Sequence, residues 1–452
     1  MHRKICFNFH VASARHGAPI NFVPRHDGNG PRNLLLHSTR FIRVLVGLAA
    51  CVASANASQR DIDQEHWVGT WSTAPTQAST PVQYTNQTLR LIAHTSIGGT
   101  RSRVRISNTF GSETLFIGAA HVAIRNTGPS IVPGTDRALS FSGRSSIAVP
   151  VGGLVLSDPV DLEVPPRTDL AVSIYLPELS SGDTTHVRGQ QNNYVSQMPG
   201  DFTAALDVPK PSVIAVSDFL TGVDVDNWSG TAIVAFGESI TAGVGSTPDT
   251  NRRWSDFLEQ RLMENHFRRV AVLNEGLPGN RIMFPGPPKA PFFGPSALAR
   301  FDRDVLGQAG LRYVVVLLGG NDIVQPGANA PMSEEVSADD VIAGHLQLIT
   351  RAHERGILIY GATTPPNENS TLFPWTFEHE AKREAMNEWI RTSGAYDAVI
   401  DFDDVLRDPT HTQQLLPAFD SGDHTHPNDA GHNAMANAID LNLFRADSRW
   451  HH

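Results

Sequence analysis

The sequence predicts an α/β fold whose parallel sheet is covered by helices on both faces, preceded by a β-sandwich or jelly-roll-like domain. Three observations indicate this. From Trp67 to about Val225, short alternating runs are separated by Gly, Pro, Asn and Asp turns, with no long helical period. After Asp226, continuous apolar strands alternate with amphipathic helices. The length of 452 residues is typical of two domains rather than one.

The β-rich half is expected over residues 67–225. Its strands include the runs 103–106 and 170–176, and turn signals such as Gly98-Gly99 and Pro165-Pro166 separate them. Because successive side chains of a strand point to opposite faces, alternation lets one face of each strand be buried. Regular short strands of this kind are typical of a sandwich or jelly roll.

The α/β half is expected over residues 228–447. We expect strands at 233–236, 270–273, 313–318, 357–360 and 398–401, and helices at 254–262, 338–355, 378–392 and 429–444. In open sheets of this kind, functional groups gather at the carboxyl ends of the strands. The candidate residues below follow such strands.

Charge is unevenly distributed along the chain. Residues 1–57 hold seven Lys or Arg and one Asp, whereas the remainder holds 29 basic and 45 acidic residues, a net charge of about −16. So acidic a chain is a poor ligand for polyanions, and we expect no nucleic-acid partner. The composition, with 40% hydrophobic and 18% charged residues, fits a soluble globular protein.

Residues 1–57 are expected to form a leader with a signal peptide. Arg40 and Arg43 precede an apolar run, and residues 55–57 offer a small-x-small cleavage site. The run is too short to span a membrane stably, so we expect a secreted or periplasmic protein. The polar stretch upstream indicates a start codon assigned too early or an extended leader. In an alternative interpretation, Cys51 ends a lipoprotein-like box and carries a lipid anchor.

Both cysteines, Cys6 and Cys51, lie in this leader. The predicted mature chain therefore has no disulfide, no thiol nucleophile and no thiolate metal ligand. Nucleophilic chemistry in this protein must come from another side chain.

Ser239 is the first candidate for that role. It follows the apolar strand 233–236 and precedes a Gly-rich turn, so its hydroxyl should emerge at the carboxyl edge of the sheet. A serine hydroxyl is a weak nucleophile until a base takes its proton. Far downstream, Asp423 and His426 could supply an imidazole oriented by a carboxylate. The alternative is a strand-to-helix turn with a capping serine.

Two further segments could stabilise an oxyanion. Gly279 lies in a Gly-rich loop after the second strand, where a backbone N–H can face the same crevice. Asn321 follows the third strand and can direct its side-chain NH₂ at a negative charge. The alternative is a local turn in which Asn321 and Asp322 bind nearby backbone.

The C-terminal cluster also permits a metal site. Its members would be Asp423, His424, His426, Asp429 and His432. The cluster lacks a recognised ligand spacing and would leave Ser239 unexplained. We therefore expect no metal and no organic cofactor.

Four blocks resemble the signature of the SGNH (GDSL-type) hydrolase superfamily, in family order over roughly residues 230–445. They are Gly237-Glu-Ser-Ile240, Gly279, Gly319-Gly-Asn-Asp322 and Asp423-x-x-His426. The resemblance implies a flavodoxin-like α/β/α sandwich with five parallel strands. It also implies that Ser239 is the nucleophile, that His426 is the general base and acid, and that Asp423 orients His426. By the same resemblance, the backbone N–H groups of Ser239 and Gly279 and the Asn321 side chain form the oxyanion hole.

The chain departs from the pattern at two positions. Glu238 stands where the signature usually has Asp, a residue that mainly shapes the turn. The extra methylene of Glu238 could shift the serine slightly. His424 lies beside His426, but the x-x-His register and the following Pro427 favour His426 as the base.

The β-rich half resembles the N-terminal domain of a secreted SGNH subgroup that is often linked to deacylation of plant polysaccharides. The segments that carry this resemblance are 67–75 and 103–111, with 297–305 in the catalytic half. The alternative is a β-domain that only packs against the catalytic half.

We therefore expect a serine esterase that cleaves short acyl esters, acetyl esters first, on a small molecule or a polysaccharide. One alternative is a lipase or lysophospholipase, which would use an apolar lid; residues 284–295 offer aromatic side chains for it, as do Trp375 and Phe377. These aromatics could equally cover the sheet edge. Another alternative, a non-catalytic carbohydrate-binding protein, leaves the intact four blocks unexplained.

Overall fold

The structure is a computed structural model that describes residues 65–445, all of which belong to one compact unit. The predicted leader over 1–57, including both cysteines, and the last two residues of the predicted catalytic domain lie outside the described residues.

The first part of the described chain contains only short strands. They are β1 (Trp67–Ser72), β2 (Thr76–Gln77), β3 (Gln83–Tyr84), β4 (Gln87–His94), β5 (Ser102–Ser107), β6 (Leu115–Ile117), β7 (Ala119–Ile124), β8 (Arg137–Ala138), β9 (Ile147–Val149), β10 (Leu154–Leu156), β11 (Asp169–Leu176), β12 (Ser180–Ser181), β13 (Thr184–Val187), β14 (Asn193–Ser196), β15 (Pro211–Ile214), β16 (Val216–Asp218) and β17 (Leu220–Asp226).

Two antiparallel sheets dominate this part. One has the order β1-β17-β5-β10 and the other β15-β14-β4-β11-β7-β8. Apolar side chains from both sheets, such as Val104 on β5 and Leu91 on β4, belong to one buried cluster. The alternation read from residues 103–106 and 170–176 thus buries one face of each sheet against the other, as a sandwich requires.

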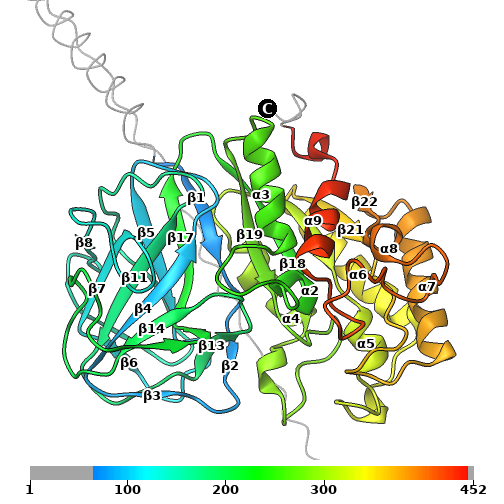
Figure 1. Ribbon diagram of the computed structural model, residues 1–452, viewed down its shortest axis with the longest axis horizontal. Coiled ribbons are helices and arrows are strands. Elements are labelled where there is room, and N and C mark those ends of the chain that lie inside the picture. Colours follow the sequence, from blue (N-terminus) through cyan, green and yellow to red (C-terminus); the bar gives the residue numbers. More distant parts are fainter. Residues whose placement is uncertain (1–64, 446–452) are drawn as a thin grey trace, which may run out of the picture. The chain divides into compact units, whose positions relative to one another are not determined.

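The second part is built on a five-stranded parallel sheet with the order β19-β18-β20-β21-β22 (Figure 1). The strands are β18 (Thr231–Gly237), β19 (Val270–Gly276), β20 (Leu311–Leu317), β21 (Leu358–Ala362) and β22 (Ala398–Ile400). In chain order this is the 2-1-3-4-5 arrangement of flavodoxin-like folds, as the resemblance implied. Strand β19 lies on one side of β18 and β20 on the other, so the order of the strands switches direction at β18. In open sheets of this kind a site is expected at the carboxyl end of the strand at the switch, here β18.

Helices cover both faces of this sheet. They are α2 (Ser239–Ala242), α3 (Trp254–Glu264), α4 (Ala297–Phe301), α5 (Gly320–Val324), α6 (Ala338–His353), α7 (Phe377–Thr392), α8 (Phe402–Leu406) and α9 (Asp429–Ala438). Alternate residues of β18 divide between two buried clusters: Val234 packs in the cluster with α4, α6 and α7, and Ala235 in the cluster with α3, α8 and α9. This burial on both faces explains why the strands are continuously apolar.

The last predicted helix, 429–444, is wrong in its extent. Helix α9 ends at Ala438, and Ile439 has an extended backbone with φ −76° and ψ 122°. A separate 3₁₀ turn, Leu441–Phe444, follows, and the Asp440 side chain accepts a hydrogen bond from the Asn442 backbone N–H. An aspartate that caps a new turn competes with continuation of the helix.

The β-rich part covers the open edge of the parallel sheet. Strand β19 is the edge strand, and its Val272 backbone N–H donates to the Ser96 hydroxyl of the β-rich part at 2.9 Å. The Gly69 N–H of β1 donates to Ala309 C=O, also at 2.9 Å. A Cβ at Gly69 would lie 2.7 Å from a methyl group of Leu273 on β19, so a larger residue there would force the Leu273 side chain to shift. The β-rich part thus satisfies groups that an edge strand leaves open.

Candidate active site

Ser239 lies two residues after the end of strand β18, at the first position of the short helix α2. The turn is tight, because a Cβ at Gly237 would lie 2.1 Å from the Thr241 hydroxyl and 2.9 Å from the Leu317 carbonyl. The residue at the helix N-cap is Glu238, whose side chain makes no capping hydrogen bond. Ser239 is therefore not the capping residue of this helix, which was the alternative to a nucleophile.

The Ser239 hydroxyl faces His426. The distance from Ser239 Oγ to His426 Nε2 is 2.8 Å, and His426 Nδ1 lies 2.6 Å from Asp423 Oδ2. The imidazole is buried, with 4% of the residue exposed. The serine and the Asp-x-x-His block, 187 positions apart in the chain, thus form one hydrogen-bonded series with the order of a serine-hydrolase triad.

Asp423 is held in its ionised form. Partial burial opposes ionisation, but hydrogen bonds and charge from His426, together with the backbone N–H groups of His426 and Thr425, keep the pKa of Asp423 well below its usual range. Such a carboxylate fixes the tautomer of the imidazole that it accepts from. It also stabilises the imidazolium that forms when the histidine takes a proton.

His424 occupies a different environment. Its side chain is 47% exposed and its Nδ1 lies 2.5 Å from Asp420 Oδ2. Its backbone has a φ of 58°, in the left-handed region. The register argument that favours His426 over His424 agrees with the hydrogen bonds: of the two imidazoles, only that of His426 lies within hydrogen-bond distance of Ser239.

Three possible donors to an oxyanion lie around Ser239. Within residues 65–445, the backbone N–H groups of Ser239 and Gly279 make no hydrogen bond. Gly279 adopts a φ of 75°, and a Cβ there would lie 2.3 Å from Phe293 Cδ1, so the loop requires glycine. The Asn321 amide donates one hydrogen to Glu238 Oε2 at 2.7 Å, which leaves its second N–H for another acceptor.

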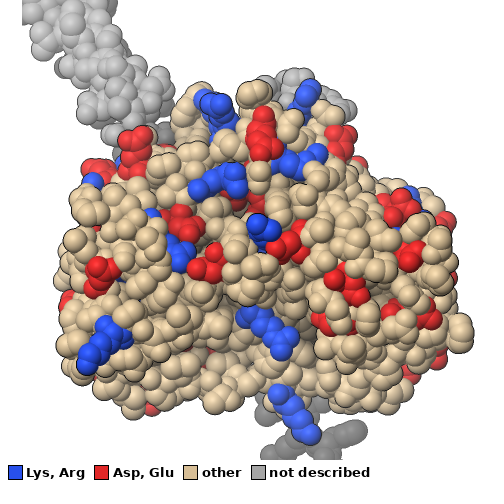
Figure 2. All heavy atoms as spheres, in the orientation of Figure 1, with Lys and Arg blue, Asp and Glu red and all other residues tan. Residues whose placement is uncertain are grey.

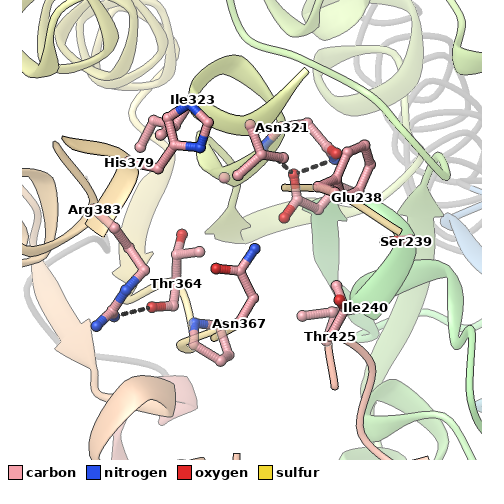
Figure 3. A pocket seen from close by; sticks show the side chains of 14 residues that line it. Glu238, Ser239, Ile240, Asn321, Ile323, Thr364, Asn367, His379, Arg383 and Thr425 are labelled. Atoms are coloured by element: carbon pink, nitrogen blue, oxygen red, sulfur yellow. Dashed lines mark hydrogen bonds between the residues drawn. The ribbon is translucent and has the colours of Figure 1, made fainter. Parts of the chain in front are cut away.

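Glu238 therefore does more than shape the turn. Its carboxylate accepts from the Asn321 side chain and, at 3.4 Å, from the Asn321 backbone (Figure 3). Burial and the nearby negative charge of Asp322 raise the pKa of Glu238 to about 8. The longer side chain at the position where the signature has Asp reaches across to orient Asn321, which is a contact that the sequence pattern did not reveal.

Asp322 does not close a local turn. Its carboxylate accepts from the backbone N–H groups of Ile282 at 2.7 Å and Met283 at 3.0 Å, which belong to the segment after Gly279. Burial raises the pKa of Asp322 to about 6. The two side chains therefore do not form the local Asx turn that was the alternative. Each binds residues distant in the sequence: Asn321 binds Glu238, and Asp322 binds the segment after Gly279.

A cavity of about 50 Å³ adjoins these groups. Its apolar wall is formed by Ile240, Ile323, Val324, Pro365 and Phe373, and its polar lining residues are Glu238, Ser239, Asn321, Thr364, Asn367, His379, Arg383 and Thr425. Figure 3 shows Asn367 between Thr364 and Thr425, with its amide group in the cavity. In the part of the chain that the structure describes, the Asn367 side chain has no hydrogen-bond partner.

Sequence reasoning missed several residues of this cavity, because Asn367, Phe373 and His379 belong to no motif and Thr425 is an unspecified position of the Asp423-x-x-His426 block. Phe373 packs against the main core cluster, and His379 lies in the first turn of α7. The one available signal was the aromatic pair Trp375 and Phe377, which the sequence could not assign to either the cavity or the sheet edge.

The aromatic insertion 284–295 does not line this cavity. Phe284 packs on the main core cluster, and the Phe293 ring contacts the Gly279 loop. Phe292 stacks edge-to-face on Phe293 with ring centroids 4.8 Å apart and lines a separate groove of the β-rich part. Of the other two aromatics, Phe377 is 79% exposed and pairs with Trp375 at 4.9 Å.

The members of the possible metal cluster do not share one centre: Asp423 and His426 pair with each other, and the remaining members have other partners. His432 is buried between the Trp254 backbone N–H and the Val244 carbonyl, and burial lowers its pKa to about 4. Asp429 binds Thr247 and Arg252. Among the described residues, no group of three His, Cys, Asp or Glu side chains is arranged to hold a metal ion.

Charges of both signs are mixed on one face of the molecule. On the face drawn in Figure 2, Lys and Arg side chains are interspersed with Asp and Glu, and neither sign forms a continuous area. That face offers no extended basic surface to a polyanion. No helix in residues 65–445 is both long and apolar enough to cross a membrane.

Comparison with known proteins agrees with the fold. Residues 235–434 match the model of the GDSL-like Lipase/Acylhydrolase family. No curated protein matches the chain at a significant level.

Among solved structures, similar ones include a GDSL-like lipase from Bacteroides thetaiotaomicron VPI-5482 (17% identity, 48% of this chain and 89% of that chain, TM-score 0.34). They also include a carbohydrate acetylesterase from Sinorhizobium meliloti (13% identity, 47% of this chain and 98% of that chain, TM-score 0.37). A third is an aryl esterase from M. smegmatis (18% identity, 48% of this chain and 99% of that chain, TM-score 0.37).

The family match covers the three strand ends and the Asp-x-x-His loop that converge on Ser239. Residues 235–434 thus form a domain of the GDSL-like Lipase/Acylhydrolase family, and this domain supports a carboxylic ester hydrolase of the SGNH (GDSL-type) kind.

Proposed function

We propose that this protein hydrolyses short acyl esters, acetyl esters first, through an acyl-enzyme on Ser239. The observation that carries this is the unbroken series from Ser239 Oγ to His426 Nε2 at 2.8 Å and from His426 Nδ1 to Asp423 at 2.6 Å. A base within hydrogen-bond distance of the nucleophile, itself oriented by a carboxylate, is the arrangement that activates a serine.

The reaction proceeds in two steps. His426 takes the Ser239 proton while Oγ attacks the ester carbonyl, and the negative charge that develops is stabilised by the Ser239 and Gly279 N–H groups and the free N–H of Asn321. His426 then protonates the departing alcohol. Water, deprotonated by His426, releases the acid and regenerates the serine. The loss of one oxyanion donor typically costs about 2.7–4 kcal/mol in the barrier.

The size of the cavity supports a short acyl chain. A cavity that binds benzene has a volume of about 150 Å³, about three times the volume of about 50 Å³ of this cavity. We therefore expect the cavity to take an acetyl group more readily than a fatty-acyl chain. The unpaired amide of Asn367 and the imidazole of His379 favour an alcohol with hydroxyl groups, such as a carbohydrate.

Longer acyl esters are the alternative substrates. The exposed ring of Phe377 beside Trp375, near the cavity residue His379, favours this reading, since exposed aromatic rings also accommodate alkyl chains.

The experiment is a series of p-nitrophenyl esters from acetate to laurate, with Ser239→Ala as the inactive reference. We expect the largest kcat/KM for acetate and loss of turnover in Ser239→Ala, whose far-UV circular dichroism should equal that of the wild type. Retained turnover in Ser239→Ala would refute the nucleophile, and a maximum at octanoate or beyond would refute the acetyl preference. Acetate release from acetylated xylan, measured beside the series, tests the carbohydrate alcohol.

We further propose that the protein is secreted or periplasmic, on the strength of Arg40, Arg43 and the apolar run after them. Mass spectrometry of the protein recovered from the producing cell would test this. An N-terminus near residue 58 is expected, whereas a lipid-bearing Cys51 would support the anchored alternative.

A further inference from the structure

Arg300 is a fully buried arginine of α4, in the segment 297–305 to which the esterase chemistry assigns no task. We propose that Arg300 is the positioning residue of the oxyanion hole, the group that sets the separation between the Ser239 and Gly279 amides. The proposal rests on the function proposed above, because it concerns the donors of that reaction.

The guanidinium group of Arg300 joins three segments at the carboxyl end of the sheet. Its Nη2 donates to the Gly237 carbonyl at 2.9 Å, its Nη1 to the Glu275 carbonyl at 2.8 Å, and its Nε to Asn280 Oδ1 at 2.9 Å. Gly237 lies two residues before Ser239, and Asn280 is the neighbour of Gly279. One side chain therefore holds the backbone on both sides of the oxyanion hole.

Strand pairing alone does not hold these loops. The last paired residues of β18 and β19 are Gly237 and Gly276, and both donors lie beyond that point. The Leu277 N–H also donates to the Gly237 carbonyl at 3.0 Å, but the chain then turns away to Gly279. Past the end of the pairing, Arg300 is a direct connection between the two loops that carry the amides.

Asn280 extends the connection to the aromatic insertion. Its Nδ2 donates to the carbonyls of Phe293 and Pro295, each at 2.8 Å, while its Oδ1 accepts from Arg300. The Phe293 ring in turn packs on Gly279. The Gly279 loop is thus fixed from one side by Arg300 and from the other by the insertion that Asn280 holds.

A carboxylate and an aromatic ring hold the Arg300 guanidinium in position. Its Nη1 lies 3.2 Å from Asp304 Oδ2, which the π-helical turn Asp302–Leu306 brings next to it, and its guanidinium lies 4.2 Å from the centroid of the Phe236 ring. Asp304 also binds Arg303, whose Nη2 reaches the Pro75 carbonyl of the β-rich part. The partner charges are therefore fixed from both parts of the chain.

The arrangement is specific for arginine. A guanidinium presents five N–H groups in a fixed plane, so it can serve three acceptors that lie in different directions. A lysine ammonium carries the same charge at a single nitrogen atom and cannot reach the Gly237, Glu275 and Asn280 acceptors together. Arg300→Lys thus keeps the charge opposite Asp304 and removes the connection between the loops.

The test is kinetic. In Arg300→Lys we expect kcat for p-nitrophenyl acetate to fall by about 30- to 100-fold with KM changed less than about threefold, because displaced donors weaken only the interactions made in the transition state. Affinity for a boronic acid that forms a tetrahedral adduct with Ser239 should fall by a similar factor.

The matched control is Arg90→Lys. Arg90 is as fully buried and also donates to carbonyl groups, those of Pro129 and Ala205, but it lies within the β-rich part. We expect Arg90→Lys to lower the melting temperature as much as Arg300→Lys does while kcat stays at the wild-type value. A folded Arg300→Lys protein with wild-type kcat and boronate affinity overturns the proposal, as does an equal loss of kcat in both variants.

If Arg300→Lys fails to fold, Asn280→Ala decides the question. That variant removes one of the three acceptors and both contacts to the insertion, and a reduced kcat with unchanged KM supports the proposal, whereas wild-type kinetics refutes it. Failure of the proposed function is recognised separately, because it would appear as turnover that survives Ser239→Ala, whatever the Arg300 variants do.

Discussion

At the scale of single residues, the site depends on which groups are charged. Asp423 is ionised through the working range of pH, since hydrogen bonds from His426 and from the backbone hold its pKa low. Glu238 behaves in the opposite way, because burial and the charge of Asp322 raise its pKa to about 8. Two carboxylates, each hydrogen-bonded to a group of the site, thus differ in charge at neutral pH because their surroundings differ.

The roles of the two neighbouring histidines can be separated by substitution. We expect His426→Ala to lower kcat for p-nitrophenyl acetate by at least about 10⁴-fold, because it removes the base that faces Ser239. His424→Ala, which removes an exposed imidazole paired with Asp420, is the matched control and should retain most of the activity. A larger loss in His424→Ala than in His426→Ala would contradict the assignment.

Glu238 should make the protein less stable as pH rises. The unfolded carboxyl ionises near its ordinary value of 4.5, whereas the folded one keeps its proton until about pH 8. Between these values the folded state binds more protons, so the free energy of unfolding falls with rising pH by up to about 1.4 kcal/mol per unit.

Glu238→Gln removes this contribution and keeps an acceptor for Asn321. Urea unfolding of both proteins at pH 5, 6.5 and 8 measures the free energy of unfolding, which should fall less steeply with pH in the variant. Asp322, whose pKa is also raised, contributes equally to the pH dependence of both proteins. Equal slopes would mean that Glu238 does not hold its proton in the folded state.

At the scale of elements, the strand ends form the site together. Ser239, Gly279 and Asn321 come after β18, β19 and β20, three neighbouring strands, so their donors meet at one edge of the sheet. The loops are held there by groups from other elements: Glu238 orients Asn321, Asp322 binds the Ile282 and Met283 amides, and Arg300 joins the ends of β18 and β19.

The Gly279 loop offers a direct test at this scale. Gly279→Ala introduces a Cβ that would lie 2.3 Å from the Phe293 ring, at a φ of 75° that disfavours any side chain. We expect kcat to fall by about 100-fold or more as the loop amide is displaced. Gly394→Ala is the control, because Gly394 also has a positive φ (66°) but open space around its Cβ position. Gly394→Ala shows the cost of backbone strain alone. Equal kcat values in the two variants would refute the displacement of the Gly279 amide.

At the scale of the whole molecule, the β-rich part completes the parallel sheet at β19. The Ser96 hydroxyl accepts from Val272, and Gly69 of β1 packs against Leu273. An uncovered edge strand with apolar neighbours pairs readily with other chains. The β-rich part therefore has a structural task, whether or not it also binds substrate.

A fragment of residues 228–447 should for this reason be less soluble and less stable than residues 58–452. Expression of both, with sedimentation and thermal unfolding as readouts, checks this. In the longer chain, Ser96→Ala removes only the acceptor of Val272 and should cost about 1 kcal/mol of unfolding free energy. A soluble, monomeric fragment with the stability of the longer chain would show that the two halves are independent domains.

Much of the fold could be predicted from local pattern. The five strands of the parallel sheet and the long helices were expected within a few residues, because their apolar periodicity results from burial on one face or two. The error at 429–444 arose where Asp440 caps a new turn, a choice between local hydrogen bonds that hydrophobic periodicity does not report.

The sequence by itself determined which chemistry we propose, since Ser239, Gly279 and Asn321 stand in recognisable blocks after strands and Asp423 and His426 in a fourth block. Only the tertiary structure decided which groups surround them. Glu238 and Arg300 make hydrogen bonds to residues 20 to 83 positions away, and no spacing encodes such contacts because they depend on how strands and loops pack. The size of the cavity, which sets the expected acyl chain, is likewise a property of packed side chains.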